Sequence, residues 1–198
     1  DTGEVIPIST ITYEYANAWD HNPSRVVDAL GGVTELSWEG GLLTSLTGPE
    51  GVSMTLNYDE FGNLTSFADQ EGNTTSFTYT AAGHLAQVTT PLGLTTSFTH
   101  DAAGNITGRQ DPDGSRWKFE YTAGRRLVAV IDPSGARTSY EYGPSGDMTA
   151  VIDPLGRRTE RTFDENGNVA TVTLPNGGVF SYVWDGLSRL IRTVDPAG

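Results

Sequence analysis

The side chains best suited to chemistry are carboxylates in short acidic segments that recur along the chain. The segment Asp164-Glu165-Asn166-Gly167-Asn168 places oxygen ligands at one-residue spacing, as calcium-binding loops do. It lacks the distal bidentate acid that completes an EF-hand loop. Asp followed by Gly and Asn is also typical of a hairpin turn, and similar segments recur where turns are expected. The pattern therefore favours turns, with a calcium site as the alternative.

Catalytic groupings are sparse in this sequence. The carboxylate pair Asp111 and Asp113 could serve acid–base chemistry, but a solvated turn is the favoured interpretation. His21, His84 and His100 are the only histidines, and no two have the spacing of a zinc site. There is no cysteine and no Gly-x-Ser-x-Gly segment. We therefore predict a protein that is not an enzyme, with no catalytic, cofactor-binding or metal-binding residues and no cofactor.

Composition excludes several classes of partner. The 198 residues include 12 Lys and Arg against 25 Asp and Glu, a net charge of −13. This charge opposes binding to nucleic acid and to anionic membranes. The sequence contains no apolar run of about 18 residues, so we predict no membrane span. The first ten residues also lack the basic start and apolar stretch of a signal peptide.

A 21-residue repeat organises the sequence. Glycines recur at this interval from residue 51 to residue 198, and proline usually stands two residues before each. Seven residues after each of the first seven glycines is an aromatic side chain or its substitute: Tyr58, Tyr79, His100, Tyr121, Tyr142, Phe163 and Trp184. Six residues further on is an aliphatic side chain or Met: Leu64, Leu85, Ile106, Leu127, Met148, Val169 and Leu190. Four positions that stay in phase over seven units indicate one repeated structural element.

Each unit has the pattern of a β-hairpin. Thr75, Phe77 and Tyr79 alternate with polar residues, which predicts a half-buried strand. A second strand is expected over residues 127–131 of a later unit, closed by the β-turn Asp132-Pro133-Ser134-Gly135. Apolar residues of the second strands often lie three apart, which breaks the alternation and predicts a β-bulge in each hairpin.

The repeat predicts an all-β chain of tandem antiparallel hairpins that form a coiled, single-layer sheet. We expect one repeat domain over residues 1–198, with a degenerate first unit at 1–30 and eight regular units at 31–198. The degenerate unit carries an insertion between Ala16 and Arg25. About nine units give roughly 18 strands and a ribbon about 85 Å long, which must coil, close or pack on another layer. Its two edge strands and apolar face predict self-association of the chain.

Three surface features have competing interpretations. The aromatic ladder could stack on sugars, although the packed face of a sheet is favoured. The basic cluster Arg157, Arg158 and Arg161 is expected to pair with Glu160 and Asp153 or to lie in solvent. Asn-x-Thr sequons, which could carry glycans in a eukaryotic secreted protein, begin at Asn63, Asn73 and Asn105. We expect these asparagines to serve the repeat instead.

The unit resembles the YD repeat of the RHS family over about residues 11–198. The resemblance is carried by segments 58–64, 163–169 and 184–190, which begin Tyr-Asp, Phe-Asp and Trp-Asp, and by Asp-Pro-x-Gly at 111–114, 132–135, 153–156 and 195–198. Departures are local. The aromatic is replaced by His100, the Asp by Thr80, Thr122 and Gly143, and the turn glycine by Ser188.

The resemblance implies a segment of a larger secreted or cell-surface protein, of bacterial type, in which YD hairpins form a hollow β-shell. The family includes polymorphic toxins, toxin-complex components, wall-associated proteins and teneurins. The implied function is structural, namely enclosure or display of a C-terminal toxin or effector cargo. The implied partners are the rest of an RHS protein and its cargo, with a homo-oligomer also expected. The alternative is an adhesive module that binds carbohydrate or protein.

Overall fold

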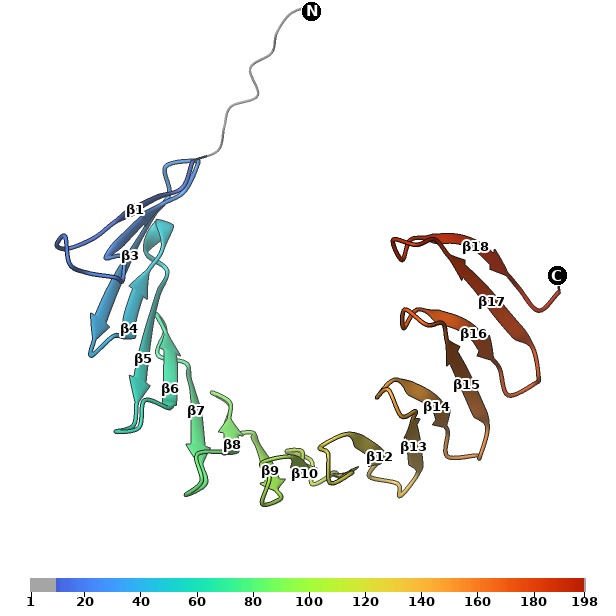
Figure 1. Ribbon diagram of the computed structural model, residues 1–198. Coiled ribbons are helices and arrows are strands. Elements are labelled where there is room, and N and C mark those ends of the chain that lie inside the picture. Colours follow the sequence, from blue (N-terminus) through green and yellow to red (C-terminus); the bar gives the residue numbers. More distant parts are fainter. Residues whose placement is uncertain (1–9, 198) are drawn as a thin grey trace, which may run out of the picture. The chain divides into compact units, whose positions relative to one another are not determined.

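The computed structural model describes residues 10–197 and divides the chain into two compact units, residues 1–97 and 98–198 (Figure 1). Part of the predicted degenerate unit, residues 1–9, and the last predicted turn residue, Gly198, lie outside the described residues. The predicted all-β, antiparallel fold is confirmed. Among residues 10–197 the single helical element is a 3-10 turn, η1 (Pro49–Gly51), and no helix is long and apolar enough to cross a membrane.

Unit 1 is a run of antiparallel strands in sequence order. Its strands are β1 (Thr12–Glu14), β2 (Arg25–Val27), β3 (Val33–Glu39), β4 (Leu42–Thr47), β5 (Ser53–Tyr58), β6 (Leu64–Asp69), β7 (Thr74–Tyr79) and β8 (Leu85–Thr89), followed by the first part of β9 (Thr95–His100). Each strand pairs with the next one in the sequence. The unit therefore grows by hairpin addition, as the repeat predicts.

Unit 2 is built by the same rule. Its strands after β9 are β10 (Ile106–Gln110), β11 (Arg116–Tyr121), β12 (Leu127–Ile131), β13 (Arg137–Tyr142), β14 (Met148–Ile152), β15 (Arg158–Phe163), β16 (Val169–Thr173), β17 (Val179–Trp184) and β18 (Leu190–Val194). Each again pairs antiparallel with its sequence neighbour. The second strand predicted at residues 127–131 coincides with β12.

The predicted bulge is present in hairpin after hairpin. In β11 and β12, Glu120 lies opposite Ala129 while Tyr121 lies opposite Leu127, so the register skips Val128. The same shift occurs just before Tyr58, Tyr79, Tyr142, Phe163 and Trp184. Because side chains alternate between faces along a strand, one skipped residue brings the apolar positions three apart onto one face.

Both kinds of turn in the repeat share one hydrogen-bond pattern. At the Asp-Pro-x-Gly turn, the Gly135 N–H donates to the Asp132 carbonyl at 2.9 Å, and the Asp132 N–H donates to the Ala136 carbonyl at 3.0 Å. At the YD turn, the N–H groups of Gly62 and Asp59 make the equivalent bonds at 3.0 and 2.9 Å. Gly135 has φ 87°, a conformation that glycine adopts without steric cost. Each turn thus needs a left-handed residue at its fourth position.

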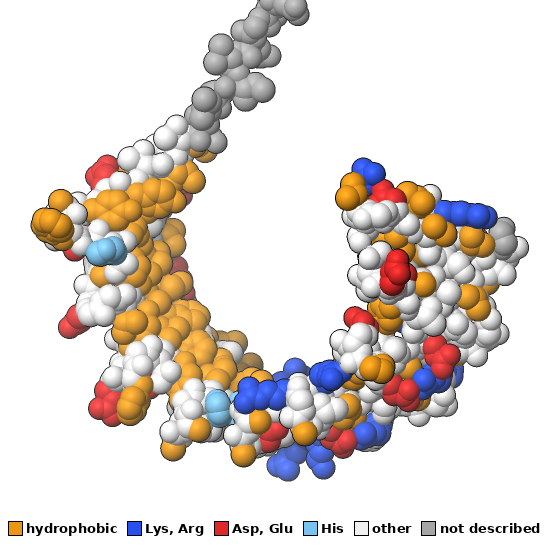
Figure 2. All heavy atoms as spheres, in the orientation of Figure 1, with side chains coloured by type: hydrophobic (Ala, Val, Ile, Leu, Met, Phe, Trp, Pro, Cys, Tyr) orange, Lys and Arg blue, Asp and Glu red, His pale blue; other side chains and the backbone are white. Residues whose placement is uncertain are grey.

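Each unit is a single layer, so the apolar face has no second sheet on it. Ala129 and Ala150 are the only hydrophobic residues of the described chain that are fully buried. Figure 2 shows apolar side chains gathered along unit 1 from β3 to β7. The stability of the fold must therefore come from contacts between neighbouring strands and hairpins, as in other repeat proteins.

Candidate functional site

In five hairpins, the aromatic side chain is hydrogen-bonded to the backbone of the hairpin before it. The Tyr142 hydroxyl donates to the Leu127 carbonyl at 2.8 Å, 15 residues earlier. The same bond is made by Tyr58 to Leu43, by Tyr79 to Leu64, by the Trp184 indole to Val169 and by the Trp38 indole to Pro23, at 2.8–2.9 Å. We call these bonds rungs. A rung needs an aromatic that carries a donor, which explains why Tyr and Trp are preferred over Phe at this position.

The aromatic ladder of the sequence analysis is therefore mainly a structural feature of the sheet. Its rings are half-buried, and Phe67 and Phe77 contact each other with centroids 5.9 Å apart. Burial raises the pKa of the Tyr121 hydroxyl above its ordinary value. These contacts agree with the packed-face interpretation.

Grooves recur between the turns of adjacent hairpins. One is lined by Phe61, Phe77 and Tyr79 together with hydroxyl groups, and has a volume of about 610 Å³. A second, three repeats later, has a volume of about 650 Å³ and is lined by Arg126, Tyr140 and Tyr142. The Arg126 guanidinium lies 5.7 Å from the centre of the Tyr142 ring. The grooves are similar in volume but differ in the charged residues that line them, so they are not identical sites.

The turn carboxylates are occupied by the turns themselves. Asp164 Oδ1 accepts bonds from the N–H groups of Asn166 and Asn168 at 2.9 Å, and Oδ2 accepts from the Asn168 amide at 3.1 Å. These bonds, led by the Asn168 side chain, hold the pKa of Asp164 below its ordinary value. Across residues 10–197, no cluster of three His, Asp or Glu side chains is placed to hold a metal ion. The geometry thus supports the turn interpretation of this segment.

The other sequence candidates also have partners within the repeat. The sequon amides of Asn63, Asn73 and Asn105 each donate to the Asp four residues earlier, at 2.8–2.9 Å. Asp111 pairs with Arg109 and accepts from the Trp117 indole, whereas Asp113 accepts from the Ser115 N–H. The two carboxylates therefore serve different neighbours and do not form a catalytic pair.

Arg157 and Arg158 of the basic cluster pair as expected, and Arg158 also makes a contact that the sequence did not indicate. Arg157 pairs with Asp153 at 2.6 Å, and Arg158 pairs with Glu160. Arg158 also makes a bidentate pair with Glu141, which lies 17 residues earlier on β13. The sequence signal for this contact was the 21-residue repeat. One repeat earlier, Arg137 and Glu120 are also 17 residues apart.

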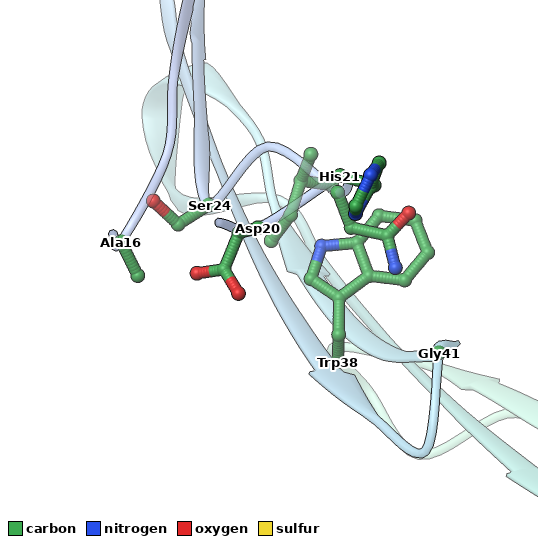
Figure 3. Close-up of a pocket in the computed structure, with 8 residues that line it drawn as sticks. Ala16, Asp20, His21, Ser24, Trp38 and Gly41 are labelled. Atoms are coloured by element: carbon green, nitrogen blue, oxygen red, sulfur yellow. The ribbon is translucent and has the colours of Figure 1, made fainter. Parts of the chain in front are cut away.

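The insertion in the degenerate unit forms a pocket of about 330 Å³ (Figure 3). Asp20, His21, Ser24 and Trp38 line it. Figure 3 shows Asp20 and Ser24 on one side of the Trp38 indole and His21 on the other, so the three do not form a catalytic triad. The Ser24 hydroxyl donates to the Glu14 carbonyl at 3.3 Å. The interruption of the repeat between residues 16 and 25 predicted an insertion here, but the sequence did not indicate a pocket.

Comparison with known proteins agrees with this architecture. A family model described as Teneurin YD-shell matches residues 50–196. No curated protein matches the chain at a significant level.

Solved structures show the same fold at low sequence identity. The chain is similar to a component of a Photorhabdus luminescens Tc holotoxin pore, with TM-score 0.70 and 17% identity, over 88% of this chain and 12% of that one. It is also similar to TcdB2–TccC3 without its hypervariable C-terminal region, with TM-score 0.66 and 16% identity, over 92% of this chain and 13% of that one. The chain thus spans about one eighth of the length of these proteins.

Proposed function

Because the chain belongs to the Teneurin YD-shell family, we propose that it is a wall segment of an RHS-type β-shell that encloses or displays a toxin or effector cargo. The mechanism is steric and requires no chemistry from the wall itself. A continuous hydrogen-bonded layer keeps a cargo polypeptide away from proteases and from the surrounding solution. The proposed setting is a secreted or cell-surface protein of bacterial type, with the rest of the shell and the cargo as partners.

The observation that carries this proposal is the rung between successive hairpins. Each rung joins the tip of one hairpin to the backbone of the hairpin before it. The backbone hydrogen bonds of the sheet join the strands of the two hairpins. A wall that is bonded at both places resists opening between repeats. The turn carboxylates are satisfied within their own turns, which is the arrangement expected of a structural element and not of a reactive surface.

The chain's association state tests the proposal. We expect light scattering after size-exclusion chromatography to show, over a concentration series, a dimer or a larger closed species, because edge strands and an uncovered apolar face favour association. A compact monomer at all concentrations would oppose the wall and favour an independent binding module. Limited proteolysis of the associated species is expected to spare the strands.

An adhesive module is the second candidate, and the recurring grooves between turns favour it. Each combines aromatic edges with hydroxyl groups, as sugar-binding surfaces do. A glycan array with the purified chain tests this function. Binding that is lost in Tyr140→Ala but kept in Phe61→Ala would locate the site at the second groove, whereas an array without binding would remove carbohydrate as the ligand.

A further inference from the structure

The insertion of the degenerate unit is a well-defined loop. The Asn17 N–H donates to Asp20 Oδ2 at 3.2 Å, and the Asp20 N–H donates back to the Asn17 carbonyl at 3.2 Å. The Trp19 N–H donates to the Asn17 side chain at 3.0 Å. At the other end of the loop, the Trp38 indole donates to the Pro23 carbonyl at 2.8 Å. These bonds fix both ends of the loop, so the pocket beside it exists before any ligand arrives.

The pocket combines a carboxylate with an aromatic face. Asp20 lies beside the indole of Trp38 (Figure 3). Leu36 also lines the pocket and supplies an apolar side chain. Asp20 Oδ2 accepts one weak backbone bond, and in the described part of the chain no Lys or Arg side chain pairs with this carboxylate. A carboxylate next to an indole is the arrangement that binds an organic cation, through charge on one side and the ring quadrupole on the other.

The charge of unit 1 favours the same ligand. Residues 1–97 include twelve Asp and Glu but a single basic residue, Arg25. Arg25 is engaged, because its guanidinium pairs with Glu14 at 2.6 Å. A field of one sign attracts ligands of the opposite sign and repels anions. Unit 1 therefore has no Lys side chain, and its one Arg side chain is already paired, so neither residue type supplies a cation to the pocket.

We propose that the pocket formed by Asp20 and Trp38 binds an arginine side chain of a partner polypeptide. The planar guanidinium stacks on the indole and donates to the Asp20 carboxylate, while the apolar stem of the side chain packs on Leu36. Arginine fits better than lysine because a planar, weakly hydrated cation stacks more closely than an ammonium group. The flanking peptide contacts two exposed aromatic residues, Tyr15 just before the loop and Trp19 within it, which are 49% and 87% exposed.

The proposal is tested by titrating the full chain with acetyl-Gly-Arg-Gly-amide. The readout is the indole N–H resonance of Trp38 in NMR spectra, assigned from its absence in Trp38→Phe. We expect saturable shifts with the arginine peptide and about tenfold weaker binding in Asp20→Asn, as loss of one charge-assisted contact implies. The matched control is Glu60→Gln, which removes the same charge from an exposed turn outside the pocket and is expected to bind normally.

Two further ligands separate the alternatives. The citrulline peptide has the same shape without the charge and is expected to bind at least about tenfold more weakly. Free arginine, whose own carboxylate is repelled by Asp20, is expected to bind more weakly than the blocked peptide. Equal binding of the citrulline peptide, equal losses in Asp20→Asn and Glu60→Gln, or tighter binding of free arginine would each overturn the proposal. So would the absence of saturable shifts in a folded protein, and none of these outcomes bears on the wall function.

Discussion

Arg137 on β13 reaches across β12 to make a bidentate ion pair with Glu120 on β11, with bonds of 2.8 and 2.9 Å. Ala129 of β12 lies on the same face between them and has no exposed surface. One unit later, Arg158 and Glu141 span Ala150 of β14 in the same way, and Ala150 is also fully buried. The only two fully buried hydrophobic residues of the described chain thus lie beneath ion pairs, on the polar face.

This arrangement predicts a small, salt-dependent coupling between Arg137 and Glu120. Glu120→Gln should lower the melting temperature by at most about 3 °C at low salt, because exposed ion pairs contribute little. Arg137→Gln should have almost no further effect once Glu120 is neutral, since the two side chains act as one unit. A double-mutant cycle by thermal unfolding at low and high salt measures this. Fully additive effects of the two changes would show that the pair contributes nothing.

The rung predicts opposite effects at two equivalent positions. Tyr142→Phe removes the donor to the Leu127 carbonyl and should lower the free energy of unfolding by about 1 kcal/mol. Phe163 occupies the same place in the next unit but has no donor, so Phe163→Tyr can add a bond to the Met148 carbonyl. We expect it to raise stability by about 0.5–1 kcal/mol. Chemical denaturation of both variants checks the pair, and a loss of stability in Phe163→Tyr would show that the rung geometry is not general.

The turn carboxylates predict acid sensitivity in a defined range of pH. Donation by side-chain amides lowers the pKa of Asp59, Asp101 and Asp164 below the ordinary value of an aspartate. A lowered folded-state pKa contributes stability that is fully present above the unfolded value and is lost as pH falls through the folded value. The contribution of these groups to stability should therefore not change with pH above about pH 5, and it should decrease as pH falls below about 4.

The measurement for this prediction is the melting temperature between pH 2 and pH 7. Because the side chain in Asp164→Asn cannot ionise, its melting temperature should fall less at low pH than that of the parent chain. Thr80→Ser is a suitable control, because Thr80 occupies the aspartate position of its turn without a charge and its hydroxyl accepts the His84 N–H at 3.2 Å. If the melting temperature of Asp164→Asn falls at low pH as much as that of the parent chain, the acid sensitivity does not arise from this turn.

The local elements could be predicted from the sequence because each residue type in the repeat has a local cause. Asp and Gly specify the turn, alternating Thr and aromatics specify the strand, and the three-residue apolar spacing specifies the bulge. The strand at residues 127–131 and the turn at 132–135 were predicted to the residue. In these places, contacts between neighbours in sequence decide the structure.

Contacts between successive hairpins were harder to predict because they depend on the register of the strands. The pairs Arg137–Glu120 and Tyr142–Leu127 join residues 17 and 15 apart, and neither spacing follows from strand periodicity alone. The pocket at Asp20 and Trp38 lies where the repeat is interrupted, so no other unit supplies a template for it. Sequence reasoning could mark the interruption but could not place the side chains around it.

Replacement of Ser188 by glycine should stabilise its turn. It occupies the glycine position of the turn that begins at Asp185 and has φ 57°, while its N–H donates to the Asp185 carbonyl at 2.9 Å. A side chain in the left-handed region is strained, whereas glycine is not. Ser188→Gly should therefore raise the free energy of unfolding by about 1 kcal/mol even though glycine is more flexible in the unfolded chain.

Ala82→Gly provides the matched control for this change. Ala82 lies one residue before the left-handed Gly83 of an equivalent turn and does not itself have a left-handed φ. Glycine there relieves no strain and adds freedom to the unfolded chain, so we expect a loss of about 0.5–1 kcal/mol. Chemical denaturation of the two variants under identical conditions compares them directly. If Ser188→Gly is destabilising by as much as Ala82→Gly, then the turn tolerates serine without strain and backbone conformation does not explain the recurring glycine.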